Sequence, residues 1–432
     1  MERRNFLRKS AGIAGLATVS GLAFNPAKTY SRPSGLKITD IRGCMVRAGG
    51  ENYPIIKIYT NQDVYGLGEV RDSGRLSQAF IYKSFLVGED PLNIEGILAK
   101  LKPMTGNSRN GGGYSAIDMA LCDIAGKVLG IPAYRLLGSK RRDKIPCYAD
   151  TPSVVDIDEY KDLLKKRVEM GFDHYKMDLQ KRIYGHGKKD AFAGRSITDK
   201  GYEYMGKYIQ AARDIIGWDK PLGADHWGYM TVDDGIRLGK AVEQYSLAYI
   251  EDVIHYRRPN SVELNSLVTE GSPTPTLHGE DLFGLEEFRP WIEQRACDII
   301  HPDMETSGGI IETKKIADYA NMHGIPVMFH FAGSPVGCLA SVHCAALVDD
   351  FISMENHAVD TEWWGDLVTG IDQPIINNGY ITVPEKPGIG VELNDEVVKE
   401  HLITEGYFEP TTQFDKPMVG THFGVPVDAI KK

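Results

Sequence analysis

The sequence lacks an excess of basic residues, is poor in cysteine, and contains no internal repeat. Lysine and arginine number 49 against 59 aspartates and glutamates, which gives a formal net charge of −10 at pH 7. Because binding to nucleic-acid phosphates draws on surplus positive charge, this composition argues against nucleic acid as a partner. Six cysteines in 432 residues, without Cys-x-x-Cys spacing, give no support for a disulfide framework. We interpret them as small, buried apolar side chains.

Long hydrophobic runs are also missing, apart from one at the N-terminus. Residues 11–24 form an uncharged run of 14 residues, too short to span a bilayer comfortably, and they follow the basic segment 3–9. This order is typical of an export signal, and the adjacent Arg3 and Arg4 resemble the bacterial twin-arginine signal. An amphipathic surface helix is the alternative, but no polar face interrupts the run. We predict that residues 1–27 are removed and that the mature protein is periplasmic or otherwise exported, without a membrane span.

The segment 36–140 is predicted to be a small α+β domain. A helix is expected to begin at Ser115, because Ser115-x-x-Asp118 resembles a capping box and apolar residues then recur at helical spacing. Strands before helices favour a separate α+β domain. Three earlier stretches that are alternating or rich in β-branched residues are predicted to be antiparallel strands: 37–42, 55–60 and 64–69.

From residue 141 onward, short apolar runs alternate with longer helical segments. This alternation, repeated eight times, predicts a parallel sheet closed as a (β/α) barrel over residues 141–380. Residues 381–432 begin rich in proline and glycine and are expected to leave the barrel and return to the first domain. The eight predicted strands are 145–149, 174–177, 221–224, 248–250, 276–278, 298–301, 326–329 and 351–354.

Acidic residues stand at the ends of several predicted strands, at the pitch of one strand–helix unit. The carboxyl ends of parallel barrel strands all face the same mouth, so these groups are expected to converge on one cavity. Three of them, Asp225, Glu251 and Glu280, would repel one another without a cation. Oxygen ligands alone favour a hard ion, Mg²⁺ or Mn²⁺. The alternative is three unrelated surface carboxylates.

Asp303, His330 and Glu355 end the next three predicted strands. A carboxylate beside an imidazole raises its basicity, so the Asp303–His330 pair is a candidate general base. Alternatively, His330 is an ordinary core histidine. Lys176, near the end of the second strand, is expected to point its ammonium group into the same mouth, or else to be a surface lysine.

Taken in order, these motifs resemble the enolase superfamily, and within it the mandelate racemase/muconate lactonizing enzyme-like family that includes acid-sugar dehydratases. The resemblance covers nearly all of the chain after the signal. It implies an α/β fold in which an N-terminal α+β capping domain covers a modified (β/α) barrel. The motifs that carry it are Ala116–Lys127, Tyr175–Asp178, Ala224–His226, Ile250–Asp252, Gly279–Asp281, Ile300–Asp303 and His330–Pro335.

The resemblance also implies a chemistry. Asp225, Glu251 and Glu280 would bind Mg²⁺, which in turn binds the carboxylate of a small anionic substrate, a sugar acid. The Asp303–His330 pair would remove the proton α to that carboxylate, and the metal would stabilise the resulting enediolate. Glu355 would hydrogen-bond the substrate carboxylate, and Lys176 would be an electrostatic partner. Barrels of this type are often symmetric assemblies, so a homo-oligomer is expected.

One departure from the family pattern bears on the reaction. Many members carry a second lysine two residues after the position of Lys176, where this chain has Asp178. Because a racemase needs an acid/base on each face of the carbanion, this favours a one-base reaction, the dehydration to a 2-keto-3-deoxy acid. His226, beside Asp225, could then protonate the leaving hydroxyl group, or it could pack against the barrel.

A second departure is an insertion at residues 181–204. Five of its basic residues would suit an anionic sugar acid if it overlies the mouth, whereas the alternative is a role in oligomer contacts. In a third departure, Asp252 is followed by Val253 in place of the usual proline, which indicates a different loop. The five basic residues of the insertion that we consider are Lys181, Arg182, Lys188, Lys189 and Arg195.

Other functions are compatible with parts of the pattern. An epimerase, racemase or cycloisomerase of the same family would proceed through the same enediolate. A metal-dependent hydrolase is disfavoured because the chain has no His-x-His pair. A non-catalytic exported protein that binds sugar acids would keep the metal ligands but would not require both Asp303 and His330.

The interpretation of residues 1–27 as an export signal predicts where the mature protein begins. Protein isolated from its source organism is expected outside the cytosol, with an N-terminus near Ala27, because export signals are cleaved after translocation. N-terminal sequencing of the fractionated protein measures this. An intact Met1 on cytosolic protein would contradict it.

Overall fold

The computed structural model describes residues 35–48, 50–151, 153–225, 228–410, 414, 421–422 and 425–426. The predicted export signal at 1–27 and the predicted acid His226 lie outside the described residues. All described residues belong to one compact unit, in which a capping part precedes a barrel.

The capping part begins with an antiparallel sheet. β1 (Ile38–Ala48), β2 (Glu51–Thr60) and β3 (Tyr65–Glu69) pair in the order β1-β2-β3, as predicted from their alternating apolar residues. The apolar side chains of β1 and β2 are buried in the main core. The helices that follow are α1 (Ser77–Phe80), α2 (Lys83–Leu86), α3 (Ile94–Leu101) and α4 (Gly112–Leu129).

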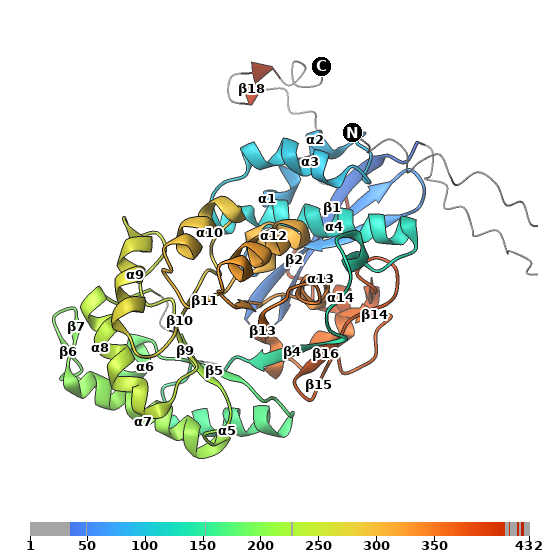
Figure 1. Ribbon diagram of the computed structural model, residues 1–432. Helices are drawn as coiled ribbons and strands as arrows, with labels where there is room; N and C mark the ends of the chain where they lie inside the picture. Colours follow the sequence, from blue (N-terminus) through green and yellow to red (C-terminus); the bar gives the residue numbers. More distant parts are fainter. Residues whose placement is uncertain are drawn as a thin grey trace, which may run out of the picture. The chain divides into compact units, whose positions relative to one another are not determined.

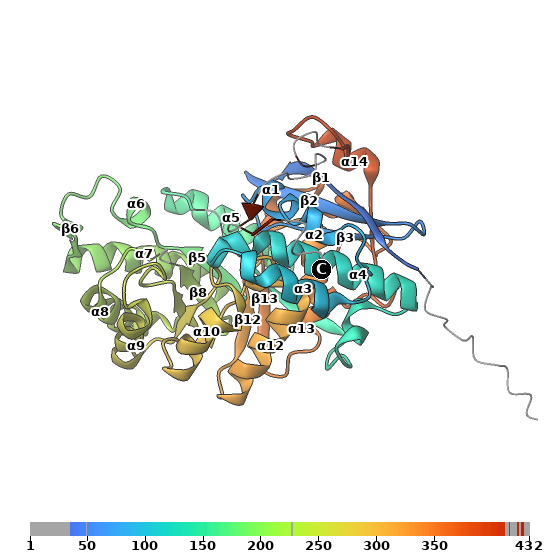
Figure 2. The same ribbon diagram turned by 90° about the horizontal axis from the view of Figure 1, so that it is seen from above.

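Helix α4 joins the capping sheet to the barrel. It packs against β3 on one side and against barrel helices on the other (Figure 1, Figure 2). The contact with β3 depends on glycine, because a Cβ at Gly68 would lie 2.0 Å from the carbonyl oxygen of Ala116. The predicted start at Ser115 is wrong, since the helix begins three residues earlier at Gly112. Asp118 does not cap it: its carboxylate accepts hydrogen bonds from the backbone amides of Ile310 and Ile311 in the barrel.

The eight apolar runs form a closed parallel barrel, as predicted. Neighbouring strands pair in chain order, and the last strand pairs with the first, which closes the barrel. The strands are β4 (Lys144–Ala149), β5 (Tyr175–Asp178), β8 (Leu222–Asp225), β9 (Tyr249–Glu251), β10 (Thr276–His278), β11 (Ile299–Ile300), β12 (Val327–Phe329) and β13 (Phe351–Asn356).

Helices connect each barrel strand to the next. Several begin at a side chain that accepts hydrogen bonds from the first free backbone amides, as Asp156, Thr198, Thr231 and Ser334 do. The insertion contributes α6 (Lys181–Tyr184) and a hairpin of β6 (Phe192–Ala193) and β7 (Ser196–Ile197). The other connecting helices are α5 (Ile157–Glu169), α7 (Asp199–Ile216), α8 (Val232–Val242), α9 (Ser261–Gly271), α10 (Gly284–Glu293), α11 (Met304–Ser307), α12 (Gly309–Met322) and α13 (Pro335–Ala345).

After the barrel closes, the chain runs back along it toward the cap. β16 (Tyr380–Thr382) pairs antiparallel with the first half of β4, while the second half of β4 pairs with β13. Farther on, the backbone amide of Ile403 donates to the carbonyl of Met45 in β1. The remaining elements are β14 (Val368–Thr369), β15 (Ile376–Asn377), β17 (Glu392–Leu393), α14 (Asp395–Glu400), β18 (Thr421–His422) and β19 (Val425–Pro426).

One expectation from composition, that the cysteines are buried and unpaired, is met within the described ranges. All six cysteines are free and buried, as apolar side chains would be. Among the helices of these ranges, none combines the length and the apolar character that crossing a membrane requires.

Candidate active site

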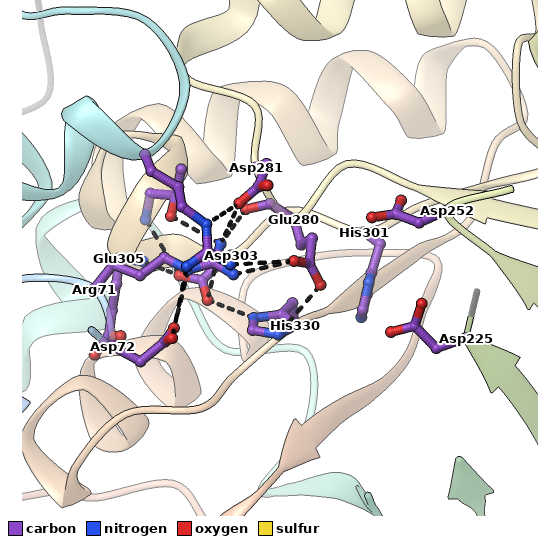
Figure 3. A network of polar contacts seen from close by, with 12 residues as sticks. Arg71, Asp72, Asp225, Asp252, Glu280, Asp281, His301, Asp303, Glu305 and His330 are labelled. Atoms are coloured by element: carbon purple, nitrogen blue, oxygen red, sulfur yellow. Dashed lines mark hydrogen bonds and ion pairs between the residues drawn. The ribbon is translucent and has the colours of Figure 1, made fainter. Parts of the chain in front are cut away.

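The predicted site residues converge at one end of the barrel, and Figure 3 shows four of them, Asp225, Glu280, Asp303 and His330. Asp225 and Glu251 are the last residues of β8 and β9, and the parallel register places them side by side. Glu280 follows β10 by two residues, and Asp303 and His330 follow β11 and β12 and form an isolated bridge between those strands. Residues that are spaced regularly along the sequence, at the ends of successive strands, therefore lie close together in the structure.

Three carboxylates form the candidate metal site. One oxygen each from Asp225, Glu251 and Glu280 lies within 4.8 Å of the others. Asp225 and Glu251 are buried, and burial together with the neighbouring carboxylates raises the pKa of both well above the usual value. A divalent cation would offset this repulsion, and an all-oxygen donor set suits a hard ion. The residues present therefore fit a divalent metal ion.

Glu280 has a different environment from its two partners. Nη2 of Arg71 lies 3.2 Å from its Oε1, and Nε2 of His330 lies 3.3 Å from its Oε2. Burial would raise the pKa of Glu280, but His330, Arg71 and Arg109 together lower it well below the usual value. Glu280 is thus held as a carboxylate by cationic neighbours, between the metal site and the histidine.

Lys176 points its ammonium group into the acidic cluster, as predicted. Its Nζ lies 2.5 Å from Oε1 of Glu355, 3.3 Å from Oε2 of Glu251 and 3.5 Å from Oδ2 of Asp225. The side chain is 1% exposed, and burial opposes its charge, but these carboxylates raise the pKa of Lys176 well above the usual value. Lys176 is therefore a permanent buried cation that partly neutralises the site.

His330 and Asp303 form a close pair. Nδ1 of His330 lies 2.6 Å from Oδ2 of Asp303, which leaves Nε2 facing Glu280 and, at 3.9 Å, Oε2 of Glu355. Asp303 is itself fixed, because its other oxygen caps α11 by accepting from the backbone amides of Glu305 and Thr306. Burial would lower the pKa of His330, but Glu280 and its other acidic neighbours raise it above the usual value. The pair has the geometry of an oriented imidazole base.

Arg71, from the capping part, was not predicted and lies at the centre of the network in Figure 3. Its Nη1 donates to Oγ1 of Thr306 at 3.0 Å and lies 3.7 Å from Oδ2 of Asp303, while Nε donates to Asp72 at 2.9 Å. It also contacts Glu280, as described above. No motif marks this residue in the sequence, because its role depends on how the cap packs on the barrel.

Glu69, two residues before Arg71, contacts the loop that follows His330, the partner of Asp303. Its carboxylate accepts hydrogen bonds from the backbone amide of Ser334 at 2.9 Å, from the hydroxyl of the same residue, and from the amide of Gly337 at 3.0 Å. Ser334 follows His330 in the loop that leads into α13. The end of β3 thus contacts both loops that carry the Asp303–His330 pair.

Two more residues missed by sequence reasoning lie beneath the site. Nδ1 of His301 lies 2.7 Å from Oε1 of Glu251, and its Nε2 lies 2.8 Å from the hydroxyl of Tyr148. That hydroxyl donates to Oε2 of Glu355 at 2.9 Å. Burial lowers the pKa of His301 to about 3, so the ring is neutral. These contacts fix the orientation of Glu251 and Glu355.

The site opens into a cavity of about 760 Å³ whose wall is mostly polar and charged. Of the five basic residues in the insertion, Arg182 lines it, while Lys181, Lys188, Lys189 and Arg195 do not. Asp178, which replaces the family's second lysine, also lines the cavity, and burial together with Asp150 raises the pKa of its carboxyl group to about 7.

The burial of Arg71 predicts a large cost for its removal. Arg71 and Arg109 contact the same three carboxylates, Asp72, Glu280 and Asp281, but Arg71 is 2% exposed and Arg109 is 40% exposed. Arg71→Met is expected to lower the free energy of unfolding by about 3–5 kcal/mol, because it leaves buried carboxylates uncompensated. Arg109→Met, the matched control, should cost about 1 kcal/mol or less. Urea unfolding without divalent cations measures both, and equal losses would contradict the assignment.

Comparisons with known proteins agree with this geometry. Residues 36–138 match the mandelate racemase/muconate lactonizing enzyme N-terminal domain, and residues 159–397 match the enolase C-terminal domain-like family. A D-xylonate dehydratase of Haloferax volcanii is 34% identical, with the alignment covering 88% of this chain and 91% of that protein. A D-galactonate dehydratase family member of Salmonella virchow is 30% identical, with the alignment covering 84% of this chain and 93% of that protein.

Solved structures agree as well. A mandelate racemase/muconate lactonizing enzyme-like protein of Rubrobacter xylanophilus superposes with a TM-score of 0.80 at 29% identity, covering 87% of this chain and all of that one. An enolase superfamily member of Salmonella Typhimurium superposes with a TM-score of 0.76 at 27% identity, covering 84% of this chain and 98% of that one. Sequence, fold and strand-end residues together show that the chain belongs to the mandelate racemase/muconate lactonizing enzyme family of the enolase superfamily.

Proposed function

We propose that the protein is a Mg²⁺-dependent dehydratase of a sugar acid, which removes the proton α to the carboxylate and expels the β-hydroxyl group to give a 2-keto-3-deoxy acid. The observation that carries this proposal is that one cavity is lined by Asp225 and Glu280 of the three-carboxylate cluster and by His330 of the Asp303–His330 pair. The dehydratases of sugar acids among the relatives support the same reaction.

Asp225, Glu251 and Glu280 would hold the metal ion. Bound Mg²⁺ supplies the positive charge that stabilises the enediolate as the α-proton leaves. His330 takes the α-proton at Nε2, while Asp303 holds the opposite ring nitrogen and stabilises the imidazolium that forms. Lys176 adds a fixed positive charge beside the substrate carboxylate. Burial would raise the pKa of Glu355, but Lys176 and the neighbouring histidines lower it well below the usual value, so this carboxylate, kept in place by Tyr148 and Lys176, accepts a hydrogen bond from a substrate hydroxyl group.

The cavity wall favours a substrate with one carboxylate and a hydroxyl-bearing tail, an aldonate. Glu51, Asp72, Asp150 and Asp252 line the wall in addition to Asp225 and Glu280 of the three-carboxylate cluster. Carboxylates accept hydrogen bonds from hydroxyl groups but repel a second carboxylate. The D-xylonate and D-galactonate in the names of relatives are of the same class.

The reaction is tested by incubating the protein and Mg²⁺ with a panel of aldonates, uronates and aldarates. The expected product is a keto acid that reacts with semicarbazide, formed from at least one aldonate. Asp303→Asn and His330→Asn are each expected to lower kcat by about 10²- to 10⁴-fold, because the oriented base is lost. Unchanged turnover in both variants would favour the non-catalytic binding protein.

Epimerisation is the second candidate, and Asp178 is the observation that favours it. A carboxyl group in the cavity wall with a pKa of about 7 could serve as a second acid/base. Exchange or epimerisation of a sugar acid in D₂O without any keto product would contradict dehydration and support this alternative.

The metal proposal predicts that a divalent cation stabilises the fold. Adding Mg²⁺ at 100-fold excess over its Kd is expected to raise the free energy of unfolding by about 2.7 kcal/mol, because the ion binds the folded chain. Asp225→Asn should remove most of this gain, while Asp318→Asn, on the exposed surface of α12, should keep it. Thermal unfolding with and without Mg²⁺ or Mn²⁺ measures the effect, and equal stability in both conditions would contradict a cation site.

Export by the twin-arginine route and homo-oligomerisation are also proposed. The N-terminal signal pattern supports the first, and the frequent symmetry of barrels of this type supports the second.

A further inference from the structure

His357 lines the cavity, but it belongs neither to the strand-end residues predicted from the sequence nor to the Asp303–His330 pair. It is the first residue after β13, and its ring lies next to that of His330, with 5.5 Å between ring centroids. Its Nε2 lies 2.9 Å from Oε1 of Glu355, which fixes the ring. Its Nδ1 lies 3.8 Å from Oδ2 of Asp150, beyond hydrogen-bond distance. Glu355 therefore holds one nitrogen, while the other lies nearest to Asp150, on a ring that lines the cavity.

The surroundings of His357 favour its protonated form. Asp150, after β4, and Glu355, on β13, face the ring. Lys176, on β5, contacts the same oxygen of Glu355 as His357 does, and the ring of His330, after β12, lies beside that of His357. Burial opposes a charge and Lys176 repels it, but the two carboxylates raise the pKa of His357 to about 10. The side chain is 30% exposed, so solvent can return a lost proton.

The two imidazoles have complementary environments. His330 is held at Nδ1 by Asp303 and presents Nε2 to the cavity, where it can accept a proton. His357 is held at Nε2 by Glu355 and presents Nδ1, where it can give one. In a β-elimination, the α-hydrogen and the leaving oxygen are on adjacent carbons, so a base and an acid that act on the same face must be neighbours. Rings on adjacent strand ends satisfy this condition.

We propose that His357 is the general acid of the dehydration, protonating the leaving β-hydroxyl group on the same face from which His330 removes the α-proton. This inference rests on the proposed function. The α C–H bond breaks with its proton passing to Nε2 of His330, and its electron pair forms the double bond between the α- and β-carbons. The β C–O bond breaks, and its electron pair leaves with oxygen, which takes the proton from Nδ1 of His357 and departs as water. The enol then tautomerises to the 2-keto acid, and no oxidant or reductant takes part.

The proposal predicts that proton removal and elimination separate when His357 is replaced. His357→Gln keeps a side chain that hydrogen-bonds Glu355 but has no acidic proton to give. In D₂O with an aldonate substrate, the rate of keto-acid formation by this variant is expected to fall by about 100-fold or more, because general acid catalysis contributes about that much to the rate. It should still exchange the α-proton for deuterium, since His330 and the metal ligands remain. NMR of the recovered substrate and semicarbazide detection of the product measure the two rates.

A leaving group that needs no proton provides the second measurement. The 3-deoxy-3-fluoro analogue of the substrate expels fluoride, so His357→Gln should release fluoride within about tenfold of the unchanged protein. His330→Asn should lose both reactions, because it lacks the base. His323→Gln, at the end of α12 and hydrogen-bonded to the carbonyl of Tyr319, is the matched control and should change neither.

Three outcomes would overturn the proposal. His357→Gln could keep normal dehydration, or it could lose exchange, dehydration and fluoride release together, which is the signature of a positioning role. The third is that His226→Gln, and not His357→Gln, uncouples exchange from elimination. If the unchanged protein forms no keto acid from any sugar acid, the proposed function itself fails, which is distinguishable from all three.

Discussion

The concentration of negative charge at the mouth of the barrel is the constraint on which the rest of the site depends. Asp225, Glu251 and Glu280 lie within a few ångströms of one another, with Asp225 and Glu251 buried and Glu280 15% exposed. Such a cluster is stable only if positive charge is built around it. Lys176 supplies one buried cation, and Arg71 supplies another beside Glu280. The remaining imbalance is what a divalent ion would correct.

The same constraint explains why the capping part belongs to the chemistry and not only to substrate enclosure. Arg71 lies at the end of the capping sheet, yet its partners Asp303 and Glu280 come from the barrel. Glu69 makes a second connection, to the loop after His330. Helix α4 holds the sheet close enough for both contacts, and it can do so because glycines in β3 leave no side chain in the way. The Asp303–His330 pair is thus held in place by residues more than 200 positions away in the sequence.

The sequence predicted that the three carboxylates, the Asp303–His330 pair and Lys176 meet at the mouth of the barrel, because strand ends recur along the chain at a nearly constant interval. In a parallel barrel this one-dimensional spacing determines which side chains meet, so no knowledge of long-range packing was needed. Arg71 and His357 have no such marker, because one comes from the cap and the other follows the last strand. The start of α4 was wrong for a related reason: Asp118 resembled a cap residue, but its partners are amides of the barrel. The insertion was expected to bring five basic residues to the mouth, and Arg182 alone lines the cavity.

The two-sided pairing of β4 has a consequence for how the chain reaches its native state. This strand is made early, but its partners β13 and β16 lie more than 200 residues downstream. Contacts between such distant segments form slowly, because a long loop must close before they gain any energy. Most of the chain must therefore be synthesised before the barrel can close. Until then the edges of β4 remain open to pairing with other chains, which makes the nascent protein a natural client for chaperones.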